Sequence, residues 1–198
     1  RYCDATYEKG KLREIIFYDK QGKTVSTTTT RKGAANIVFY TAEGIKAGEG
    51  YFNRDGDKDG KYTTYYQSGL VSEVSNWKDG ELHGEVISYY TDGKIKKKTN
   101  YNNGQENGYV IDYYANGKIS AEGWRVDGNR QQQYLYYNNL GELTTTEYFL
   151  NDDLDGYICY YDPGNVLNAE YFYDNGWRES ILQIGKNGAM LSESNFEK

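Results

Sequence analysis

A chain of 198 residues with 23 Tyr, 23 Gly, six Phe and a single Pro suits many short strands joined by tight turns, and it suits helices poorly. Its net charge of −6 is spread along the chain, and the only dense basic run is Lys96-Lys97-Lys98, so no nucleic-acid partner is expected. No stretch reaches the roughly 20 apolar residues of a membrane-spanning helix, so we expect no transmembrane segment.

The chain begins at Arg1 rather than Met, and its first residues read as the second strand of a hairpin, with Tyr7 three residues before Gly10. We therefore expect a mature form or a piece of a longer chain, and we favour a secreted, periplasmic or cell-surface location. Open strands at the end of a sheet invite pairing with another segment. We expect preceding chain or a partner to cover this edge.

Three markers recur with one period of about 24 residues, which is typical of a repeat array. The first is a turn glycine, at Gly22, Gly44, Gly69, Gly93, Gly117, Gly141, Gly164 and Gly188. The second is the glycine of the return turn, at Gly10, Gly33, Gly56, Gly80, Gly104, Gly128 and Gly176, with Asp152 in one place. The third is the second residue of an aromatic doublet, at Tyr18, Tyr40, Tyr66, Tyr90, Tyr114, Tyr137 and Tyr161. We predict one all-β domain over residues 1–198, an elongated, twisted antiparallel meander of about eight β-hairpins that forms an open array without a globular core.

The first strand of each hairpin alternates with period two, so the residues one and three places before the last tyrosine should form one buried face. This rule selects Ile15 and Phe17, Ile37 and Phe39, Thr63 and Tyr65, Ile87 and Tyr89, Ile111 and Tyr113, Tyr134 and Tyr136, and Ile158 and Tyr160. The second strand should add the residues two and eight places after the turn glycine: Val71 and Trp77, Ile95 and Tyr101, Leu143 and Phe149, Val166 and Phe172, and Met190 and Phe196. Trp124 comes one residue early, which predicts a shifted aromatic or a small bulge.

The second tyrosine of each doublet then points to the opposite face of the sheet. There these tyrosines either pack over neighbouring strands or form an exposed ladder, and an exposed ladder would be a binding surface. The candidate binding residues are Tyr66, Tyr90, Tyr114, Tyr137 and Tyr161.

Few groups in the sequence suggest chemistry. His83 is the only histidine, and Cys3 and Cys159 lie about six repeats apart, beyond disulfide reach in an extended array, so we expect free thiols, no cofactor and no enzyme. Asp55, Asp57 and Asp59 match the start of a calcium loop, but Tyr66 stands where the closing Glu would be. Turn chemistry also explains this segment and the equivalent residues 151–156.

The pattern Tyr-Tyr-x-x-Gly-Lys-Ile, followed by Tyr-x-x-Gly and then His-Gly or Asn-Gly, occurs at residues 89–108, and a close version occurs at 65–84. It resembles the MORN-repeat variant found in many bacterial proteins, most clearly from residue 60 to 176. The resemblance implies an array of hairpins with no catalytic residues in the repeat, and some bacterial members of that group are described as antitoxin components.

These observations predict a non-catalytic interaction or scaffold module that binds a protein partner through its tyrosine-bearing face or an open edge strand. A first alternative is a carbohydrate or cell-envelope ligand stacked on the same tyrosines. A second is an antitoxin or immunity protein, which the resemblance alone implies.

Overall fold

The computed structural model describes residues 2–185 and 189–195, so the predicted turn residue Gly188 and core residue Phe196 lie outside the described residues. The described residues form 20 β-strands and no α-helix, which confirms the all-β prediction. Among them no helix is long and apolar enough to cross a membrane. The elongation of the array stays a prediction.

The chain divides into two compact units. The first unit comprises Arg1–Ile95 and Tyr101–Gly104, and the second comprises Lys96–Asn100 and Gln105–Lys198. The strand β10 (Ile95–Asn102) therefore contributes residues to both.

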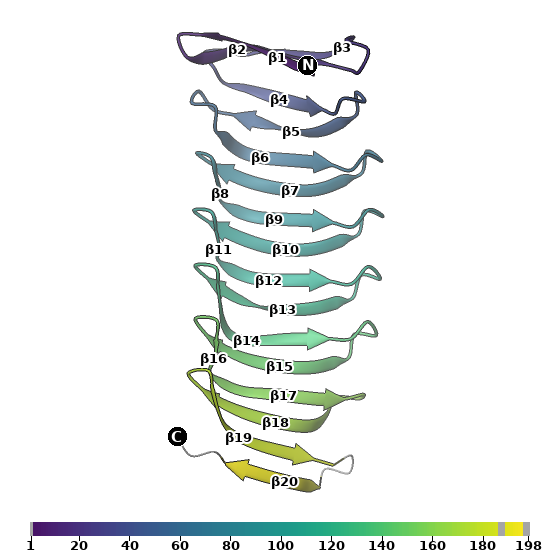
Figure 1. The fold of residues 1–198 in the computed structure, drawn as a ribbon, viewed down its shortest axis with the longest axis vertical. Coiled ribbons are helices and arrows are strands. Elements are labelled where there is room, and N and C mark those ends of the chain that lie inside the picture. The colour runs from purple at the N-terminus through teal and green to yellow at the C-terminus, as the bar shows by residue number, and fades with distance from the viewer. Residues whose placement is uncertain (1, 186–188, 196–198) are drawn as a thin grey trace. The chain divides into compact units, whose positions relative to one another are not determined.

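The first unit contains two antiparallel sheets (Figure 1). One consists of β1 (Cys3–Glu8), β2 (Lys11–Tyr18) and β3 (Thr24–Thr29) in that order. The other runs through β4 (Ala35–Tyr40), β5 (Lys46–Phe52), β6 (Lys58–Tyr65), β7 (Val71–Lys78), the short β8 (Glu81–Leu82) and β9 (Gly84–Tyr89). Each long strand pairs with the next along the chain, as in a meander of hairpins.

The second unit repeats this arrangement as one open antiparallel meander. Its strands are β11 (Gln105–Glu106), β12 (Gly108–Tyr113), β13 (Ile119–Val126), β14 (Asn129–Tyr137), β15 (Leu143–Leu150), β16 (Asp153–Leu154), β17 (Gly156–Asp162), β18 (Val166–Asp174), β19 (Trp177–Ile184) and β20 (Met190–Asn195). Successive long strands pair from β12 to β20, so this region is the predicted chain of hairpins.

Within the described residues the predicted turns lie where expected, except that Asn165 stands in the place of Gly164 and Gly56 closes a turn of the first kind. In the first kind of turn, Thr41 N donates to Ile45 O at 2.8 Å and Gly44 N donates to Thr41 O at 2.9 Å. The return turn needs two left-handed residues, and Asp79 and Gly80 have φ of 48° and 86°. Asp152 holds the same conformation without being glycine, with φ of 71°.

Each unit buries most of one face of its long sheet, which we call the core face, while Thr63 and Thr146 are also buried on the opposite face, at 9% and 4% exposed. Its most buried first-strand side chains are Ile37 and Val86 in the first unit and Val110, Tyr134 and Ile158 in the second, all 7% exposed or less. Glycines on the neighbouring strands make room for rings, because a Cβ on Gly50 would lie 2.4 Å from the ring of Tyr62. Gly123 stands in the same relation to Tyr134, at 2.5 Å.

The predicted core face is wrong by one residue in the middle of the chain. The misassigned pairs are Thr63 and Tyr65, Ile87 and Tyr89, and Ile111 and Tyr113. Tyr89 ends β9, and Tyr90 opens the turn by donating its N–H to Lys94 O at 2.7 Å. The prediction places the end of each of these strands at the second tyrosine, one residue too late. A shift of one residue exchanges the core face and the opposite face of a strand. The buried residues are Val86 and Val110 rather than Ile87 and Ile111.

One predicted core aromatic, Phe172, also lies on the other face, together with Trp124. Phe172 pairs with Tyr157, on the face opposite Ile158. The reason is a turn that is shifted by one residue. Tyr161 pairs with Leu167 as Tyr40 pairs with Lys46, so Asn165, and not Gly164, stands in the position of Gly44. Trp124 pairs with Tyr109 on that same opposite face, which we call the outer face. Of the two alternatives predicted for Trp124, the shifted aromatic holds, because β12 and β13 pair without interruption from Gly108 to Asp112. The β13–β14 register shift between Glu122 and Trp124 is a feature of the repeat, since β5–β6 shift in the same way between Gly50 and Phe52.

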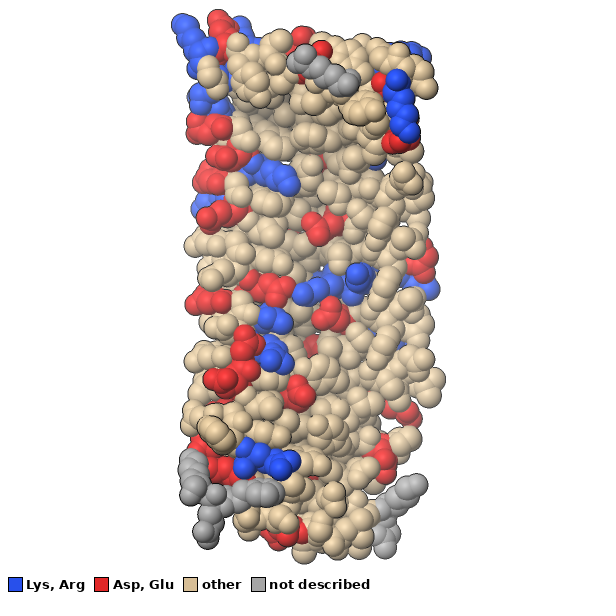
Figure 2. All heavy atoms as spheres, in the orientation of Figure 1, with Lys and Arg blue, Asp and Glu red and all other residues tan. Residues whose placement is uncertain are grey.

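Charge of both signs is spread over the surface. On the side drawn in Figure 2, acidic and basic side chains are interspersed, and most of the surface carries neither. The spread of charge expected from the sequence is therefore visible on this side of the molecule.

Candidate functional site

The five predicted binding tyrosines occupy two different positions. Tyr66, Tyr90 and Tyr114 open turns, whereas Tyr137 and Tyr161 belong to the strands β14 and β17. All five are partly covered. They therefore do not form the single ladder that the sequence suggested, and a binding role for them stays a prediction.

The hydroxyl groups of the turn tyrosines serve the fold. Tyr66 Oη donates to Tyr89 O at 2.5 Å, and Tyr114 Oη donates to Tyr137 O at 2.7 Å. Each bond joins one hairpin to the next within its unit. This is the alternative in which the tyrosines pack over neighbouring strands.

The strand tyrosines are held on the outer face. Tyr137 Oη donates to Glu122 Oε1 at 2.7 Å, and burial together with this bond raises the pKa of Tyr137 to about 12. Burial also raises the pKa of Tyr161. Neither ring is an open stacking platform.

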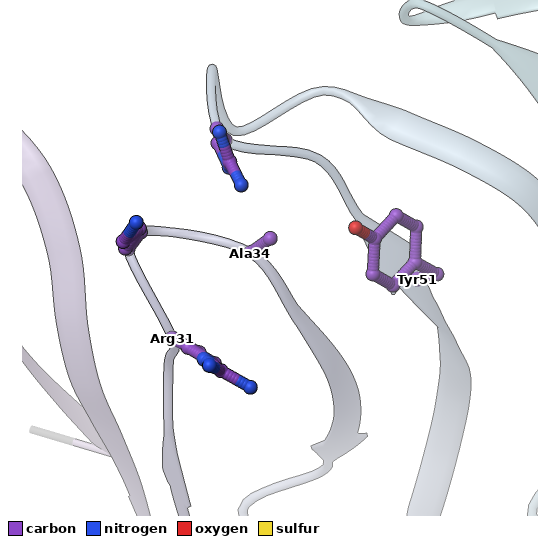
Figure 3. A pocket seen from close by; sticks show the side chains of 5 residues that line it. Arg31, Ala34 and Tyr51 are labelled. Atoms are coloured by element: carbon purple, nitrogen blue, oxygen red, sulfur yellow. The ribbon is translucent and has the colours of Figure 1, made fainter.

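The calcium candidate has other partners in the structure. Asp55 Oδ1 receives Lys11 Nζ at 2.6 Å, and this hydrogen bond lowers the pKa of Asp55. The neighbouring Arg54 lines a pocket with Arg31 and Tyr51, seen from close by in Figure 3. Among the described residues, no group of three or more acidic, cysteine or histidine side chains gathers where it could hold a metal. Calcium binding by Asp55, Asp57 and Asp59 stays a prediction.

The other singled-out groups lie apart from any site. His83 is exposed, and its backbone N–H donates to the backbone oxygen of Asn76 at 2.9 Å, just before β9 begins. Cys3 and Cys159 are both free thiols, which agrees with the prediction for them.

Three exposed aromatic side chains lie together on the outer face of the second unit. Trp124 is 46% exposed, Tyr148 41% and Tyr157 48%. Tyr109 pairs with Trp124, Gln133 with Tyr148, and Tyr157 with Phe172, so one row crosses the strands from β12 to β18. We call the five rings of this row the aromatic strip: Tyr109, Trp124, Tyr148, Tyr157 and Phe172.

The rings of the aromatic strip support one another. Tyr109 and Trp124 meet edge to face with centroids 5.5 Å apart, and Tyr157 and Phe172 meet at 4.9 Å. Such pairs contribute about 0.5–1.5 kcal/mol beyond their buried area. The rings are therefore held in place while part of each stays in water.

A carboxylate fixes one end of the aromatic strip. Burial, reinforced by a hydrogen bond to Glu122, raises the pKa of Tyr109 to about 12. Glu122 also receives the hydroxyl of Tyr137. One carboxylate therefore holds two tyrosines, and Tyr109 cannot turn away from Trp124 without losing a charged hydrogen bond.

A shallow pocket opens along the aromatic strip. Its volume is about 370 Å³, and its walls include Tyr109, Trp124 and Tyr148 with the side chains of Gln132 and Gln133. Rings and amides together can stack on a ligand and hydrogen-bond to it. No titratable pair with catalytic geometry lines this pocket among the residues that the structure describes.

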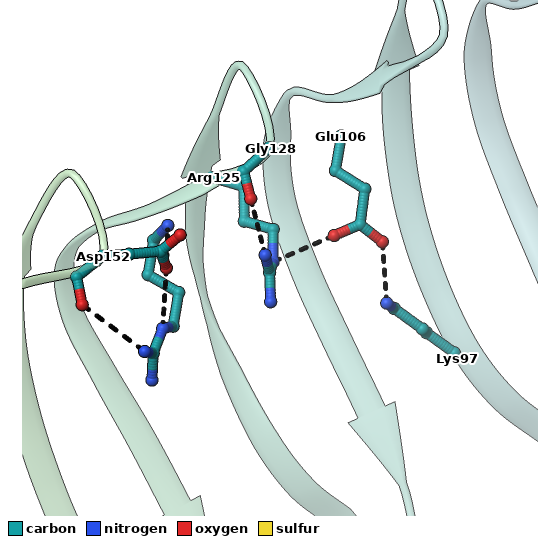
Figure 4. Close-up of polar contacts among 6 residues, drawn as sticks. Lys97, Glu106, Arg125, Gly128 and Asp152 are labelled. Atoms are coloured by element: carbon teal, nitrogen blue, oxygen red, sulfur yellow. Dashed lines mark hydrogen bonds and ion pairs between the residues drawn. The ribbon is translucent and has the colours of Figure 1, made fainter.

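The shift that exposes Trp124 places a cation on the core face. Arg125 pairs with Gly108, in the place where Phe52 pairs with Ala35. Figure 4 shows how this charge is compensated: Arg125 Nε lies 2.9 Å from Glu106 Oε2, and Lys97 Nζ lies 2.8 Å from Glu106 Oε1. Arg125 Nη1 also donates to Gly128 O at 2.6 Å. An ion cluster thus lies on the core face at the residue that follows Trp124.

The aromatic strip was not predicted from the sequence, because the tyrosine doublets indicated other residues. A usable signal was present, since Tyr109, Gln133 and Tyr157 recur with a spacing of 24 residues, as do Trp124, Tyr148 and Phe172. Finding it required the strand ends, which fix the residues that share a face.

Comparisons with known proteins support the repeat and little else. The family model described as "MORN repeat variant" matches residues 82–103, so the resemblance is confirmed in that segment. No curated protein matches the sequence. Two solved structures are similar over most of the chain at low identity: "Crystal Structure of TcdB2-TccC3-Cdc42" (11% identity, TM-score 0.27, 96% of this chain and 12% of that one) and "Crystal Structure of TcdB2-TccC3" (12%, 0.26, 95% and 13%). The chain thus spans a small part of those chains, and nothing about its function follows from them.

Proposed function

We propose that this chain is a non-catalytic binding module that holds a protein partner on its aromatic strip. The observation that carries the proposal is the outward exposure of Trp124, Tyr148 and Tyr157 on one row of a single sheet, between 41% and 48% each. Aromatic side chains, Trp and Tyr above all, dominate the energy of protein interfaces. A contiguous exposed apolar surface on an ordered scaffold is typical of an interaction site.

The aromatic strip is organised before a partner arrives. The ring pairs Tyr109 with Trp124 and Tyr157 with Phe172 are already formed, and they stand on strands rather than on a loop. Side chains that are ordered beforehand lose less entropy on binding, at about 0.5–1.5 kcal/mol for each mobile side chain. This organisation favours recognition by a defined surface.

The surroundings of the aromatic strip suit the edge of an interface. Gln132 and Gln133 are exposed beside the rings and offer both donors and acceptors. Interfaces of this type combine an apolar centre with a polar, solvent-accessible rim. The partner expected here is therefore a protein surface with an apolar patch bordered by backbone or side-chain polar groups.

The test compares two tryptophans that differ in position and not in chemistry. The partner is first isolated on the wild-type chain from the source cell and purified, and its affinity is then measured by calorimetry. Trp124→Ala should weaken binding about 10- to 100-fold, as loss of an interface hot spot does. Trp177→Ala is the matched control, because Trp177 is 76% exposed on β19 and lies outside the strip. Equal affinities of wild type and Trp124→Ala, with equal unfolding midpoints, would refute the proposal.

A carbohydrate ligand is the second candidate, and the pocket of about 370 Å³ is the observation that favours it. Trp124 and Tyr148 offer ring faces, and Gln132 and Gln133 offer amides to hydroxyl groups, a combination suited to a sugar ring. A panel of oligosaccharides should then bind saturably, with loss in Trp124→Ala and retention in Tyr90→Ala and Tyr114→Ala. Loss in the latter two variants alone would place the ligand on the turn tyrosines.

A further inference from the structure

A second pocket lies in the first unit, where the three-stranded sheet meets the longer one. Its volume is about 380 Å³, and it is lined by Arg31, Lys32, Ala34, Tyr51 and Arg54. Figure 3 shows Arg31 and Ala34 on one turn and Tyr51 on the neighbouring strand, with the Tyr51 hydroxyl turned toward that turn. Three of the five lining residues are cations, on a chain whose net charge is −6.

These three cations have no ion-pair partner within the part of the chain that the structure describes. The nearby Lys11, by contrast, is paired with Asp55 at 2.6 Å. The pairing of Asp55 with Lys11 matters most, because Asp55 follows Arg54 and its carboxylate is already occupied. The pocket therefore keeps an uncompensated positive charge.

The backbone beneath the cations is fixed by two turns. Arg31 and Ala34 exchange backbone hydrogen bonds of 3.1 and 3.2 Å across Lys32 and Gly33, whose φ values are 56° and 91°. Arg54 lies in a turn whose first residue, Asn53, accepts the N–H groups of residues 55 and 57 on Oδ1 at 2.9 and 3.0 Å. Both turns are closed without the charged side chains, which remain available to a ligand.

Gly33 brings the two turns together. A Cβ at this position would lie 3.1 Å from Arg54 O and 3.2 Å from Lys11 Cβ. Only glycine tolerates both this approach and the left-handed backbone. The close contact gathers Arg31, Lys32 and Arg54 around one space.

We propose that this pocket binds the phosphate monoester group of a small soluble metabolite. Arg31 and Arg54 would each offer the paired donors that match phosphate oxygens, and Lys32 would add a point charge. A phosphate monoester carries close to two negative charges at pH 7, so it compensates three cations better than a single carboxylate does. The Tyr51 ring, 39% exposed, would lie against the sugar or base that carries the phosphate.

Calorimetry at low ionic strength tests the proposal with inorganic phosphate, ribose 5-phosphate and adenosine monophosphate as ligands, and adenosine and acetate as controls. All three phosphates should bind, and adenosine should not. Stronger binding of the nucleotide than of the sugar phosphate would assign a nucleotide source, and the reverse a sugar source. Failure of all three phosphates, or acetate binding as tightly as phosphate, would overturn the proposal.

Two double variants of equal charge change then locate the site. Arg31→Gln with Arg54→Gln should weaken phosphate binding at least about tenfold, because two of three cations are removed from the pocket. Lys20→Gln with Lys23→Gln removes the same charge from an exposed turn of the same unit and should leave the affinity within about twofold, since screened surface charges act weakly at a distance. Equal weakening in both double variants would show a general charge effect and no site. Thermal unfolding of each variant confirms that it is folded.

Discussion

The two units are built from the same type of hairpin, but they differ in the row of outer-face residues that forms the aromatic strip in the second unit. In the first unit Asn36 pairs with Tyr51 and Lys61 with Asn76, so the row is mostly polar. In the second unit the equivalent pairs are Tyr109 with Trp124 and Tyr157 with Phe172. Turns and core face define the hairpin and leave this row unconstrained, so binding specificity can be placed on it without changing the fold.

The core faces of the two units differ as well. In the first, Phe39 lies 5.7 Å from Phe17, 5.6 Å from Phe52 and 6.2 Å from Tyr62 between ring centroids. In the second, Arg125 occupies the position equivalent to Phe52 and is compensated by Glu106. At this position a repeat of the first unit makes aromatic contacts and a repeat of the second makes ion pairs, although Phe149 on β15 keeps an aromatic contact with Tyr134 at 5.7 Å.

The largest expected loss of stability comes from a feature that both units have, a glycine that lies under a tyrosine ring. Gly123→Val should lower the free energy of unfolding by about 3 kcal/mol, because the added side chain has no room beneath Tyr134. Gly50→Val should act in the same way in the first unit. Urea unfolding measures both, and adding Tyr134→Leu to Gly123→Val should recover part of the loss. An unchanged midpoint for Gly123→Val would show that the ring does not lie over this glycine.

A smaller effect tests which residue faces the core. Val110 is 3% exposed, so Val110→Ala should cost about 2 kcal/mol for two lost methyl groups and the cavity that they leave. Ile111→Ala removes more carbon from a half-buried position on the outer face and should cost only about 1 kcal/mol. The reverse order would restore the strand register that the sequence first suggested.

The assignment of strand residues to the two faces separates what could be predicted from the sequence from what could not. The period, the hairpins and the turns follow from glycine spacing, because left-handed turn positions admit few other residues. The face of each strand did not follow wherever Tyr doublets stand at a strand end, since both faces carry apolar residues: Val86 and Ile87, or Val110 and Ile111, satisfy either register. Periodicity alone cannot decide between them.

The candidate site was hidden for the same reason. Gly164 as the turn glycine predicts Phe172 to be a core aromatic, and the outward position of Trp124 follows only from its pairing with Tyr109. Each of these features is a displacement by a single residue within a repeat, and the total period does not record it. The cationic pocket could not be predicted from the sequence, because Arg31 and Arg54 line one pocket only through the close approach of their turns at Gly33.

The charged core position of the second unit gives the next prediction. Glu106→Gln should lower stability by about 1–2 kcal/mol, because it leaves Arg125 and Lys97, which are 28% and 32% exposed, without their shared carboxylate. Arg125→Met, which makes the position apolar as in the first unit, should stay within about 1 kcal/mol of wild type. Thermal and urea unfolding compare the two variants. If Arg125→Met lost more stability than Glu106→Gln, the arginine itself, and not the compensation of its charge, would stabilise this part of the core face.

The smallest effect is a shift in titration. Tyr109 and Tyr137 share Glu122 and have pKa values raised to about 12, first by burial and then by that carboxylate. Folded pKa values above the unfolded value of about 10 stabilise the protein fully below pH 10, and this contribution is lost as pH rises from about 10 to about 12. Glu122→Gln should lower the two pKa values only part of the way to 10, since burial remains, as followed by NMR of ring-labelled tyrosine. Glu49→Gln removes the equivalent partner of Tyr65 in the first unit and should leave Tyr109 and Tyr137 unchanged. If Glu122→Gln left both values unchanged, the carboxylate would not hold the end of the aromatic strip, and burial alone would orient Tyr109 toward Trp124.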